Sequence, residues 1–570
     1  MDKDWVIQNG GWNGSCDTWQ NYYAMTSAED PFTAIANGTG PFKLDYWTPN
    51  VEISLLRNSD YWRGTPMWEG GPSGPAALGQ VLIKNIQDEP TRYALLTNGD
   101  ADMAALSSAY YSQLDSQVLF NYEQKDGLAG TLVHPDGTLK LYSGGLSPSV
   151  THVLFNYDIA TGGPRNYIGS GTLDGNGIPT DFFSDIHVRK AFNYAFNWTT
   201  YISDVFGGGA IQSRGPIISG LLGYTDTQPT YYYDPTLAMQ EFGQAWGGAV
   251  LTHGFTLTIP YNQGSTTRQA IANILKNNIE ALDPNFHINV LELPWSDYLS
   301  DQRAYYLPIM TGGWYQDIPH PHNWVQPFLV GTYAYRQRLP DAIKAAYQTK
   351  INTCVALTDS AAQTCYEDIQ NTTYLDAIDI FLAQPYVRQY LRAEVRGHYV
   401  NDSLFGPYFY ALSKGPLPTI QTITPSSDYT VNFSSTQGTT AALALPAGSV
   451  TQTLDIIVTP DTVTTGEPTG FHLGNLAFDI QAYVGGTPLA SLDFLNPVTL
   501  TLNYNSQATG SLIEEELRLF WWDGAAWVDA ACRPYVRDTV NNTLQVPICH
   551  LSKFAIGGPS YDIYLPLILR

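Results

Sequence analysis

The chain has 570 residues, of which 44% are apolar and 13% aromatic. Because one hydrophobic core rarely serves more than about 250–300 residues, we expect several structural units and exclude wholesale disorder. Aspartate and glutamate number 52 against 28 lysines and arginines, which gives a formal net charge of −24. A field of that sign repels phosphate backbones and anionic lipid, so we expect no nucleic-acid partner.

The spacing of the cysteines favours two local disulfides. Cys354 lies eleven residues before Cys365, Cys532 lies seventeen residues before Cys549, and Cys16 stands alone. Each closed loop stabilises a fold by about 3 kcal/mol in the chain-entropy model, and such bonds need an oxidising compartment. Buried free thiols are the alternative.

The first element with a clear pattern is a helix at residues 185–196. Apolar side chains recur there on one stripe, and Ser184 or Asp185 is suited to cap the first turn. The stripe consists of Val188, Ala191, Phe192, Ala195 and Phe196. We therefore expect this helix to pack on a core.

Residues 255–293 predict a β-α-β unit. Residues 255–259 alternate as a strand, residues 271–282 have apolar side chains at helical spacing, and residues 288–293 form another strand. Such units have a right-handed crossover and parallel strands, and ligands bind beyond the carboxyl ends of parallel strands. We expect the next strand at residues 305–310, so the loop at residues 312–321 is a candidate binding loop.

The composition changes near residues 414–418, where Lys-Gly-Pro-Leu-Pro precedes a threonine-rich region. Downstream, short alternating apolar runs separated by turn residues predict an all-β sandwich at residues 418–560. Such modules serve as spacers or adhesion modules. The tail at residues 561–570 is apolar but too short to span a bilayer.

Residues 38–44, Gly-Thr-Gly-Pro-Phe-Lys-Leu, and residues 54–64 resemble a passage of oligopeptide-binding proteins, the peptide/nickel-type extracellular solute-binding subunits of ABC importers. Further segments resemble this family in the same order. They are residues 98–103, 155–156, 185–196, 233–238, 313–321 and 395–401. The resemblance thus extends from about residue 5 to residue 414.

The resemblance implies an α/β, two-lobed, periplasmic-binding-protein-like (type II) fold that closes over an extended ligand. Residues 1–216 would be the remainder of lobe I, residues 217–394 lobe II, and residues 395–417 the return to lobe I. In the family a large part of the first lobe precedes residues 38–44, and no leader is visible at Met1. We therefore expect an N-terminally incomplete chain with uncovered sheet edges and apolar surface.

Asp317 is the leading site candidate, because the family places an acidic residue there to meet a peptide's α-amino group. At about 4 Å and an effective dielectric of 20, that pair supplies about 4 kcal/mol before desolvation. A turn cap before Pro319 is the alternative. Trp314 would be a flat wall beside the ligand or a core tryptophan, and Arg303 would meet a ligand carboxylate or lie on a solvated helix face.

Peptides of varied sequence are recognised through main-chain hydrogen bonds, with side chains in hydrated pockets. Phe155 and Asn156 would contribute such contacts from a strand at the cleft edge, and ordinary strand packing is the alternative. His320 and His322 near Asp317 suggest a metal site, but prolines separate them. We expect a plain loop there, with no metal and no cofactor.

These features together favour an extracytoplasmic substrate-binding component of an ABC importer that captures di- to oligopeptides and meets the permease subunits as a monomer. The G-x-S-x-G, H-E-x-x-H and phosphate-loop motifs are absent, so we expect no enzyme, although a glycosidase carboxylate pair stays open. The alternatives are a carbohydrate- or nickel-binding member of the family, and an adhesion or structural protein with a relic binding domain.

Overall fold

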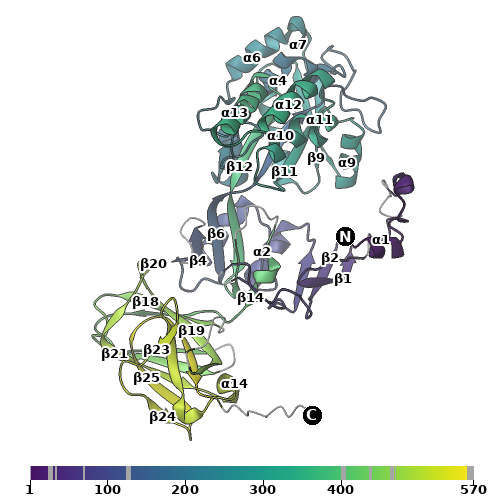
Figure 1. Ribbon diagram of the computed structural model, residues 1–570. Helices are drawn as coiled ribbons and strands as arrows, with labels where there is room; N and C mark the ends of the chain where they lie inside the picture. The colour runs from purple at the N-terminus through teal and green to yellow at the C-terminus, as the bar shows by residue number, and fades with distance from the viewer. Residues whose placement is uncertain are drawn as a thin grey trace.

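The computed structural model describes residues 2–22, 30–32, 35–68, 71–123, 130–399, 406–434, 439–461, 468 and 470–560. It consists of an upper α/β lobe, a lower lobe and a β-sandwich at the far end of the lower lobe (Figure 1). The expected two-lobed α/β fold followed by an all-β domain is therefore confirmed. Among the described residues, no helix is both long and apolar enough to cross a bilayer.

Two groups of strands form the sheets of the upper lobe. β7 (Ser149–Phe155) pairs antiparallel with β11 (Ile309–Tyr315) and with the first part of β12 (Asp379–Arg392), which also pairs with β8 (Ala210–Gln212). The second group is the predicted β-α-β unit: β9 (Phe255–Asn262) and β10 (Phe286–Leu293) are parallel, and α8 (Thr266–Glu280) joins them.

The strand expected at residues 305–310 begins later, as β11, and extends through Gly312 to Tyr315. Tyr305 has a positive φ of 65°, and its carbonyl accepts a hydrogen bond from Asn156 Nδ2 (2.9 Å), so the chain turns there. Gly312 and Gly313 therefore lie in the strand rather than in the expected loop.

The helices of the upper lobe cover its sheets. The predicted helix at 185–196 is confirmed as α4 (Ile186–Ala195). Asp185 caps its N-terminus by accepting a hydrogen bond from the His187 N–H (2.8 Å). The others are α5 (Trp198–Phe206), α6 (Pro235–Gln244), α7 (Ala249–His253), α9 (Trp295–Arg303), α10 (His322–Leu329), α11 (Thr332–Arg336), α12 (Asp341–Cys354) and α13 (Asp359–Leu375). A disulfide joins Cys354 to Cys365 and so links α12 to α13.

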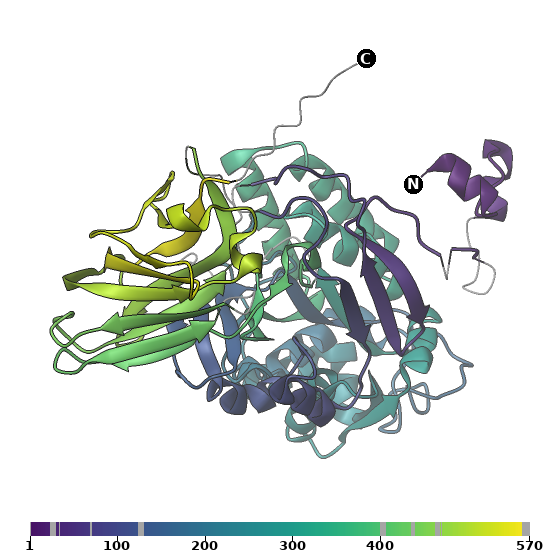
Figure 2. The ribbon, with the colours of Figure 1, turned by 90° about the horizontal axis from the view of Figure 1, so that it is seen from below.

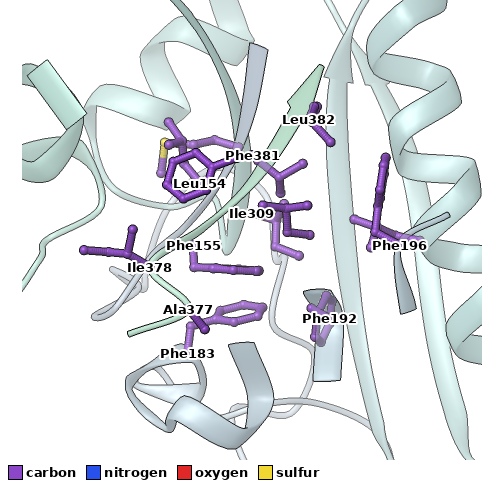
Figure 3. Close-up of a cluster of buried hydrophobic side chains, with 14 of the residues drawn as sticks. Leu154, Phe155, Phe183, Phe192, Phe196, Ile309, Ala377, Ile378, Phe381 and Leu382 are labelled. Carbon is purple, nitrogen blue, oxygen red and sulfur yellow. The ribbon is translucent and has the colours of Figure 1, made fainter. Parts of the chain in front are cut away.

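Two chain crossings connect the lobes. β6 (Leu139–Leu146) of the lower lobe continues through Ser147 and Pro148 into β7, and β12 returns: its residues 379–383 pair with β7 and its residues 386–392 with β6. One buried cluster extends from Val150 to Ala383, and Figure 3 shows part of it. The expected lobe boundary at 216 and 217 falls inside this cluster, so we divide the lobes at these crossings instead.

The lower lobe contains α2 (Glu89–Asn98), α3 (Tyr111–Asp115) and a sheet of β6, the second half of β12, β4 (Val118–Glu123) and β5 (Thr131–Leu132). Beside it lies a three-stranded antiparallel sheet of β1 (Phe42–Thr48), β2 (Glu52–Arg57) and β3 (Gln80–Lys84). Two short pieces complete it: β13 (Val395–Arg396) and β14 (Ser413–Lys414). The short helix α1 (Lys3–Gln8) precedes all of them.

The predicted sandwich is confirmed as two packed antiparallel sheets. One has β15 (Thr419–Ile423), β18 (Leu454–Asp461), β19 (His472–Val484), β20 (Thr487–Pro488), β22 (Arg518–Trp522), β23 (Trp527–Asp529) and β26 (Lys553–Gly558). The other has β16 (Tyr429–Ser434), β17 (Thr440–Leu445), β21 (Asp493–Asn503), β24 (Val536–Asp538) and β25 (Thr543–His550). Short α14 (Ser506–Thr509) follows β21, a disulfide joins Cys532 to Cys549, and the tail at 561–570 lies outside the described residues.

The sandwich packs directly on the lower lobe. Ile457 and Tyr483 of the sandwich share a buried cluster with Leu119, Phe120 and Leu132 of the lower lobe. The Leu132 N–H also donates to the carbonyl of a sandwich residue, Gly486 (2.9 Å). The contact is thus apolar at its centre and hydrogen-bonded at its edge.

Candidate ligand-binding site at the hinge

The hinge is formed by Ser147 and Pro148 on one crossing and by Gln384 and Pro385 on the other. The Ser147 N–H donates to the Pro385 carbonyl (2.7 Å), and the Gln384 side chain donates to the Ser147 carbonyl (3.0 Å). Gln384 is only 2% exposed and also accepts from the Ser219 N–H (2.9 Å). The two crossings are therefore tied to each other.

β11 brings Trp314 and Asp317 to this hinge. Tyr315, the last residue of β11, pairs with Ser149, and the next N–H, that of Gln316, donates to the Pro148 carbonyl (3.1 Å). The carboxyl end of β11 thus meets the crossing between the lobes. Asp317 follows one residue later, on the hinge side of the upper lobe.

Asp317 is exposed but held in place by Asn323, in the first turn of α10. The Asp317 N–H donates to Asn323 Oδ1 (2.8 Å), and Asn323 Nδ2 donates back to Asp317 Oδ2 (3.0 Å). No hydrogen bond to a described residue engages the other carboxylate oxygen, Oδ1. The arrangement presents a fixed negative charge with one oxygen open to a positively charged group.

Trp314 is half-buried and supported from behind by two helices. Its ring packs edge-on against Phe328 of α10 (6.3 Å) and Tyr333 of α11 (6.2 Å). Its indole N–H donates to Asn323 Oδ1 (3.4 Å), the same oxygen that holds Asp317. Trp314 and Asp317 therefore form one rigid unit, in which Trp314 takes part in the core while part of its surface stays open.

Phe155 and Asn156 do not belong to this unit. Phe155 pairs with Ile309 at the opposite end of β11, has no exposed surface and stacks on Phe183 (5.0 Å; Figure 3). Asn156 is buried, and its side chain donates to the carbonyls of Tyr305 (2.9 Å) and Leu307 (3.1 Å). The prediction that they contact ligand is therefore wrong, because both lie in the interior. Phe155 packs in the core, and Asn156 holds the turn before β11.

Arg303 also lies away from Asp317. It is exposed in the last turn of α9, which leads into the amino end of β11, whereas Asp317 follows the carboxyl end. The seven residues of β11 separate the two ends by roughly 20 Å, at about 3.4 Å per residue. The structure therefore does not place Arg303 where it could meet the other end of a short ligand held by Asp317.

Sequence reasoning missed the hinge residues of β12. Tyr386 is 41% exposed, and its N–H donates to the Gly209 carbonyl (2.9 Å). Two residues further into the lower lobe, Arg388 forms an ion pair with Asp115, and Tyr390 donates to the same carboxylate (2.7 Å). The alternation of Tyr386, Arg388 and Tyr390 with smaller residues is the pattern that indicates this strand.

The two histidines after β11 form a turn. The His322 N–H donates to the ring Nδ1 of His320 (3.1 Å), which occupies one of the nitrogens that a metal would need. Burial, together with neighbouring His320, lowers the pKa of His322. Within the described part of the chain, no three histidine, cysteine or acidic side chains gather closely enough to hold a metal ion.

Known proteins resemble this chain in sequence. The model of the "bacterial extracellular solute-binding proteins, family 5 Middle" matches residues 16–336, a segment that includes the whole Asp317 unit. Heme-binding protein A of Haemophilus influenzae is 22% identical over 379 residues, which are 66% of this chain and 59% of that protein. Di/tripeptide-binding protein 2 of Pseudomonas aeruginosa is 27% identical over 289 residues, 50% of this chain and 44% of that protein. The chain therefore spans only part of the length of these relatives.

Two solved structures resemble the fold. The periplasmic binding protein DppA from Helicobacter pylori, in complex with the peptide STSA, has a TM-score of 0.53 and 20% identity and covers 73% of this chain and 67% of its own. The dipeptide-binding protein from Pseudoalteromonas sp. SM9913, in complex with Met-Leu, has a TM-score of 0.54 and 16% identity and covers 73% of this chain and 69% of its own.

Proposed function

Because the chain belongs to family 5 of the bacterial extracellular solute-binding proteins, we propose that it captures peptides outside the cytoplasm for an ABC importer. The observation that carries this proposal is the fixed, half-open carboxylate of Asp317 at the hinge between two lobes. The peptide complexes of the two similar structures support it. The chain acts by binding and release, and its partners are the permease subunits.

The α-amino group of a peptide docks on Oδ1 of Asp317. Closing of the lobes about the hinge removes water from the ammonium, which then needs an opposite charge nearby. At about 4 Å and an effective dielectric of 20, the pair gains about 4 kcal/mol before desolvation is subtracted. Trp314 forms a flat wall beside the first residues of the peptide.

Thermal unfolding with and without peptide tests this proposal. The probes are Met-Leu and Ser-Thr-Ser-Ala, each with a free or an N-acetylated amino terminus. We expect the free peptides to raise the Tm by linkage and the acetylated forms to raise it far less, because acetylation removes the ammonium. Asp317→Asn should weaken the Kd at least tenfold, about 1.4 kcal/mol.

Asp181→Asn is the matched control, because it removes one exposed carboxylate from the same lobe without touching the hinge. It should bind as the unaltered protein does. Equal binding of free and acetylated peptides, or an unchanged Kd in Asp317→Asn, contradicts the proposal. Titration with an oligosaccharide mixture and with Ni²⁺ separates peptide binding from the carbohydrate and nickel alternatives.

A further inference from the structure

A carboxyl group and an amide are bonded to each other in the interior of the upper lobe. Asp379, the first residue of β12, is 1% exposed, and Gln337, which directly follows α11, has no exposed surface. Gln337 Nε2 donates a hydrogen bond to Asp379 Oδ1. The second oxygen atoms, Asp379 Oδ2 and Gln337 Oε1, are both buried and have no hydrogen-bond partner among the described residues. The two unpaired atoms thus belong to side chains that are already joined.

A single proton would pair these two oxygens. An ionised carboxylate only accepts hydrogen bonds, and so does an amide oxygen, so the two cannot bond to each other while Asp379 is charged. A protonated carboxyl group has one O–H donor. With a proton on Asp379 Oδ2, the acid and the amide form two parallel hydrogen bonds in one ring: N–H to Oδ1, and O–H to Gln337 Oε1. Buried polar atoms are rarely left unpaired, which favours this form.

The groups around Asp379 do not offer it another partner. Arg189 of α4 is 4% exposed, and its hydrogen bonds to described residues all go to backbone carbonyls, those of Phe183, Ser184, Asp376 and Ala377. Tyr157 packs under the Arg189 guanidinium (4.7 Å), and its hydroxyl has no described partner. Tyr347 of α12 donates to Asp376 instead (2.8 Å). Burial therefore raises the pKa of Asp379 well above its ordinary value, although the Gln337 hydrogen bond and Arg189 oppose this.

We propose that Asp379 keeps its proton at neutral pH and forms a two-bond acid–amide pair with Gln337, which acts as a pH-sensitive lock in the upper lobe. The pair connects two parts of the candidate site. The Gln337 N–H donates to the carbonyl of Tyr333 (2.8 Å), the α11 residue that supports Trp314, whereas Asp379 begins the strand that becomes the hinge. The sandwich contributes no residue to the surrounding cluster and lies apart from these helices in both views (Figures 1 and 2).

The lock opens as the pH rises. When Asp379 releases its proton to solvent, the O–H···O hydrogen bond is lost and a negative charge is left in the core. In the unfolded chain an aspartate has its ordinary pKa of about 3.9, so the folded chain holds this proton to a higher pH than the unfolded chain does. The contribution to stability is therefore complete below pH about 4. It falls about tenfold in the folding constant per pH unit, up to the pKa of the folded chain.

Urea unfolding of the peptide-free protein at pH 5.5 and 7.0 tests the proposal. Asp379→Asn is the informative variant, because an amide at this position makes the same two hydrogen bonds but carries no titrating proton. From the lower to the higher pH, the folding constant of the unaltered protein should fall about thirtyfold relative to that of Asp379→Asn. Asp181→Asn, which removes an exposed carboxylate of the same lobe, is the matched control, and its ratio to the unaltered protein should stay constant.

Infrared spectroscopy at pH 7.0 detects the pair itself. A protonated carboxyl group has a carbonyl stretching band that an ionised carboxylate lacks. The difference spectrum between the unaltered protein and Asp379→Asn should contain this band, and the difference spectrum with Asp181→Asn should not. In Gln337→Met, which keeps a side chain of similar volume but removes the amide, the band should move to higher frequency, because the Asp379 carbonyl no longer accepts a hydrogen bond.

Three results overturn the proposal. A ratio of folding constants that does not change with pH in Asp379→Asn, or the absence of the band from its difference spectrum, would show that Asp379 is ionised. A band that stays in place in Gln337→Met would show that the proton is not shared with this amide. Both measurements are made without ligand, so their failure is distinguishable from failure of the peptide proposal.

Discussion

Asn323 determines the direction in which Asp317 presents its charge. The Asn323 Oδ1 atom accepts hydrogen bonds from the Asp317 N–H and the Trp314 indole N–H, and Asn323 Nδ2 donates one to the Asp317 carboxylate. The carboxylate therefore does not need to be ordered when ligand arrives, which lowers the entropy lost on binding. The sequence pattern of this loop indicates Asp317 as the acidic residue. The role of Asn323, six residues later, is recognised only from the three-dimensional structure.

His152 predicts how stability depends on pH. It lies in the core between Phe328 (4.4 Å) and Phe381 (4.8 Å), neither ring nitrogen has a hydrogen-bond partner, and burial lowers its pKa to about 3. Below pH about 6.5 the unfolded chain binds a proton that the folded chain rejects, so stability falls as the pH falls towards 3. His152→Phe should remove this loss, which is about 1.4 kcal/mol per pH unit.

Urea unfolding at pH 7.0 and 4.5 measures this difference. The loss of unfolding free energy between the two pH values should be about 2.5 kcal/mol smaller in His152→Phe than in the unaltered protein. His134→Gln is the control, because His134 is exposed and its substitution should leave the difference unchanged. An equal loss in His152→Phe and the unaltered protein would show that another group causes the loss of stability at low pH.

At the residue scale, sequence reasoning separated surface from interior poorly. Asp317 and Phe155 both belong to family motifs at strand ends, yet one is exposed at the hinge and the other is in the core. The difference arises because β7 and β11 are antiparallel, which puts Phe155 at one end of the pair and Asp317 beyond the other. Strand direction depends on the partner, which a single sequence does not state.

At the scale of elements, β12 combines the roles of core strand and hinge. Its 14 residues pair with β7 at one end and β6 at the other, and the register shifts between Tyr386 and Arg388, just beyond the crossing. Gln384 holds the crossing through hydrogen bonds to Ser147 and Ser219. We expect closing of the lobes to bend the chain within a few residues of this side chain.

Gln384→Ala should loosen the hinge. It leaves the half-buried Ser147 carbonyl and the half-buried Ser219 N–H without partners, at about 1 kcal/mol. We expect faster hydrogen exchange at Ser147, Ser219 and Tyr386, measured by mass spectrometry of the peptic peptides that contain them. Gln389→Ala, on the same strand, is the control and should leave exchange at these positions unchanged. Unchanged exchange in Gln384→Ala would mean that backbone pairing alone holds the crossing.

The elements that sequence reasoning placed well are those with local patterns. α4 and the β9-α8-β10 unit follow from apolar spacing and a capping residue within one stretch of chain. β11 was placed too early, because the turn at Tyr305 depends on Asn156, about 150 residues away in the sequence. The missed β12 is defined by its two partner strands rather than by its own composition.

At the scale of the whole molecule, the sandwich is a structural part of the lower lobe rather than a separate spacer. Phe120 and Tyr483 pack with ring centroids 6.0 Å apart, inside a cluster to which both domains contribute. The boundary that sequence composition marks near residue 418 is therefore a change of architecture within one packed body.

A chain that ends after Leu417 should be less stable and should aggregate, because Leu119, Phe120 and Leu132 lose their cover. Calorimetry of the full chain should show the sandwich and the lower lobe unfolding in one transition, and the shortened chain should bind the dye ANS. Leu495→Lys, 63% exposed on the sandwich, is the control and should alter neither. Two separate transitions in the full chain would contradict this coupling.

The continuity of β12 also has a mechanical consequence. A pulling force applied between the sandwich and the upper lobe would pass through the lower lobe along β12, because β12 is one of the two crossings that join the lobes. The ladder hydrogen bonds between β12 and the continuous β6–β7 stretch would then carry the load in shear, all together, instead of breaking one by one. We expect the crossing between the lobes to resist such a force while the lobes stay free to move about the hinge.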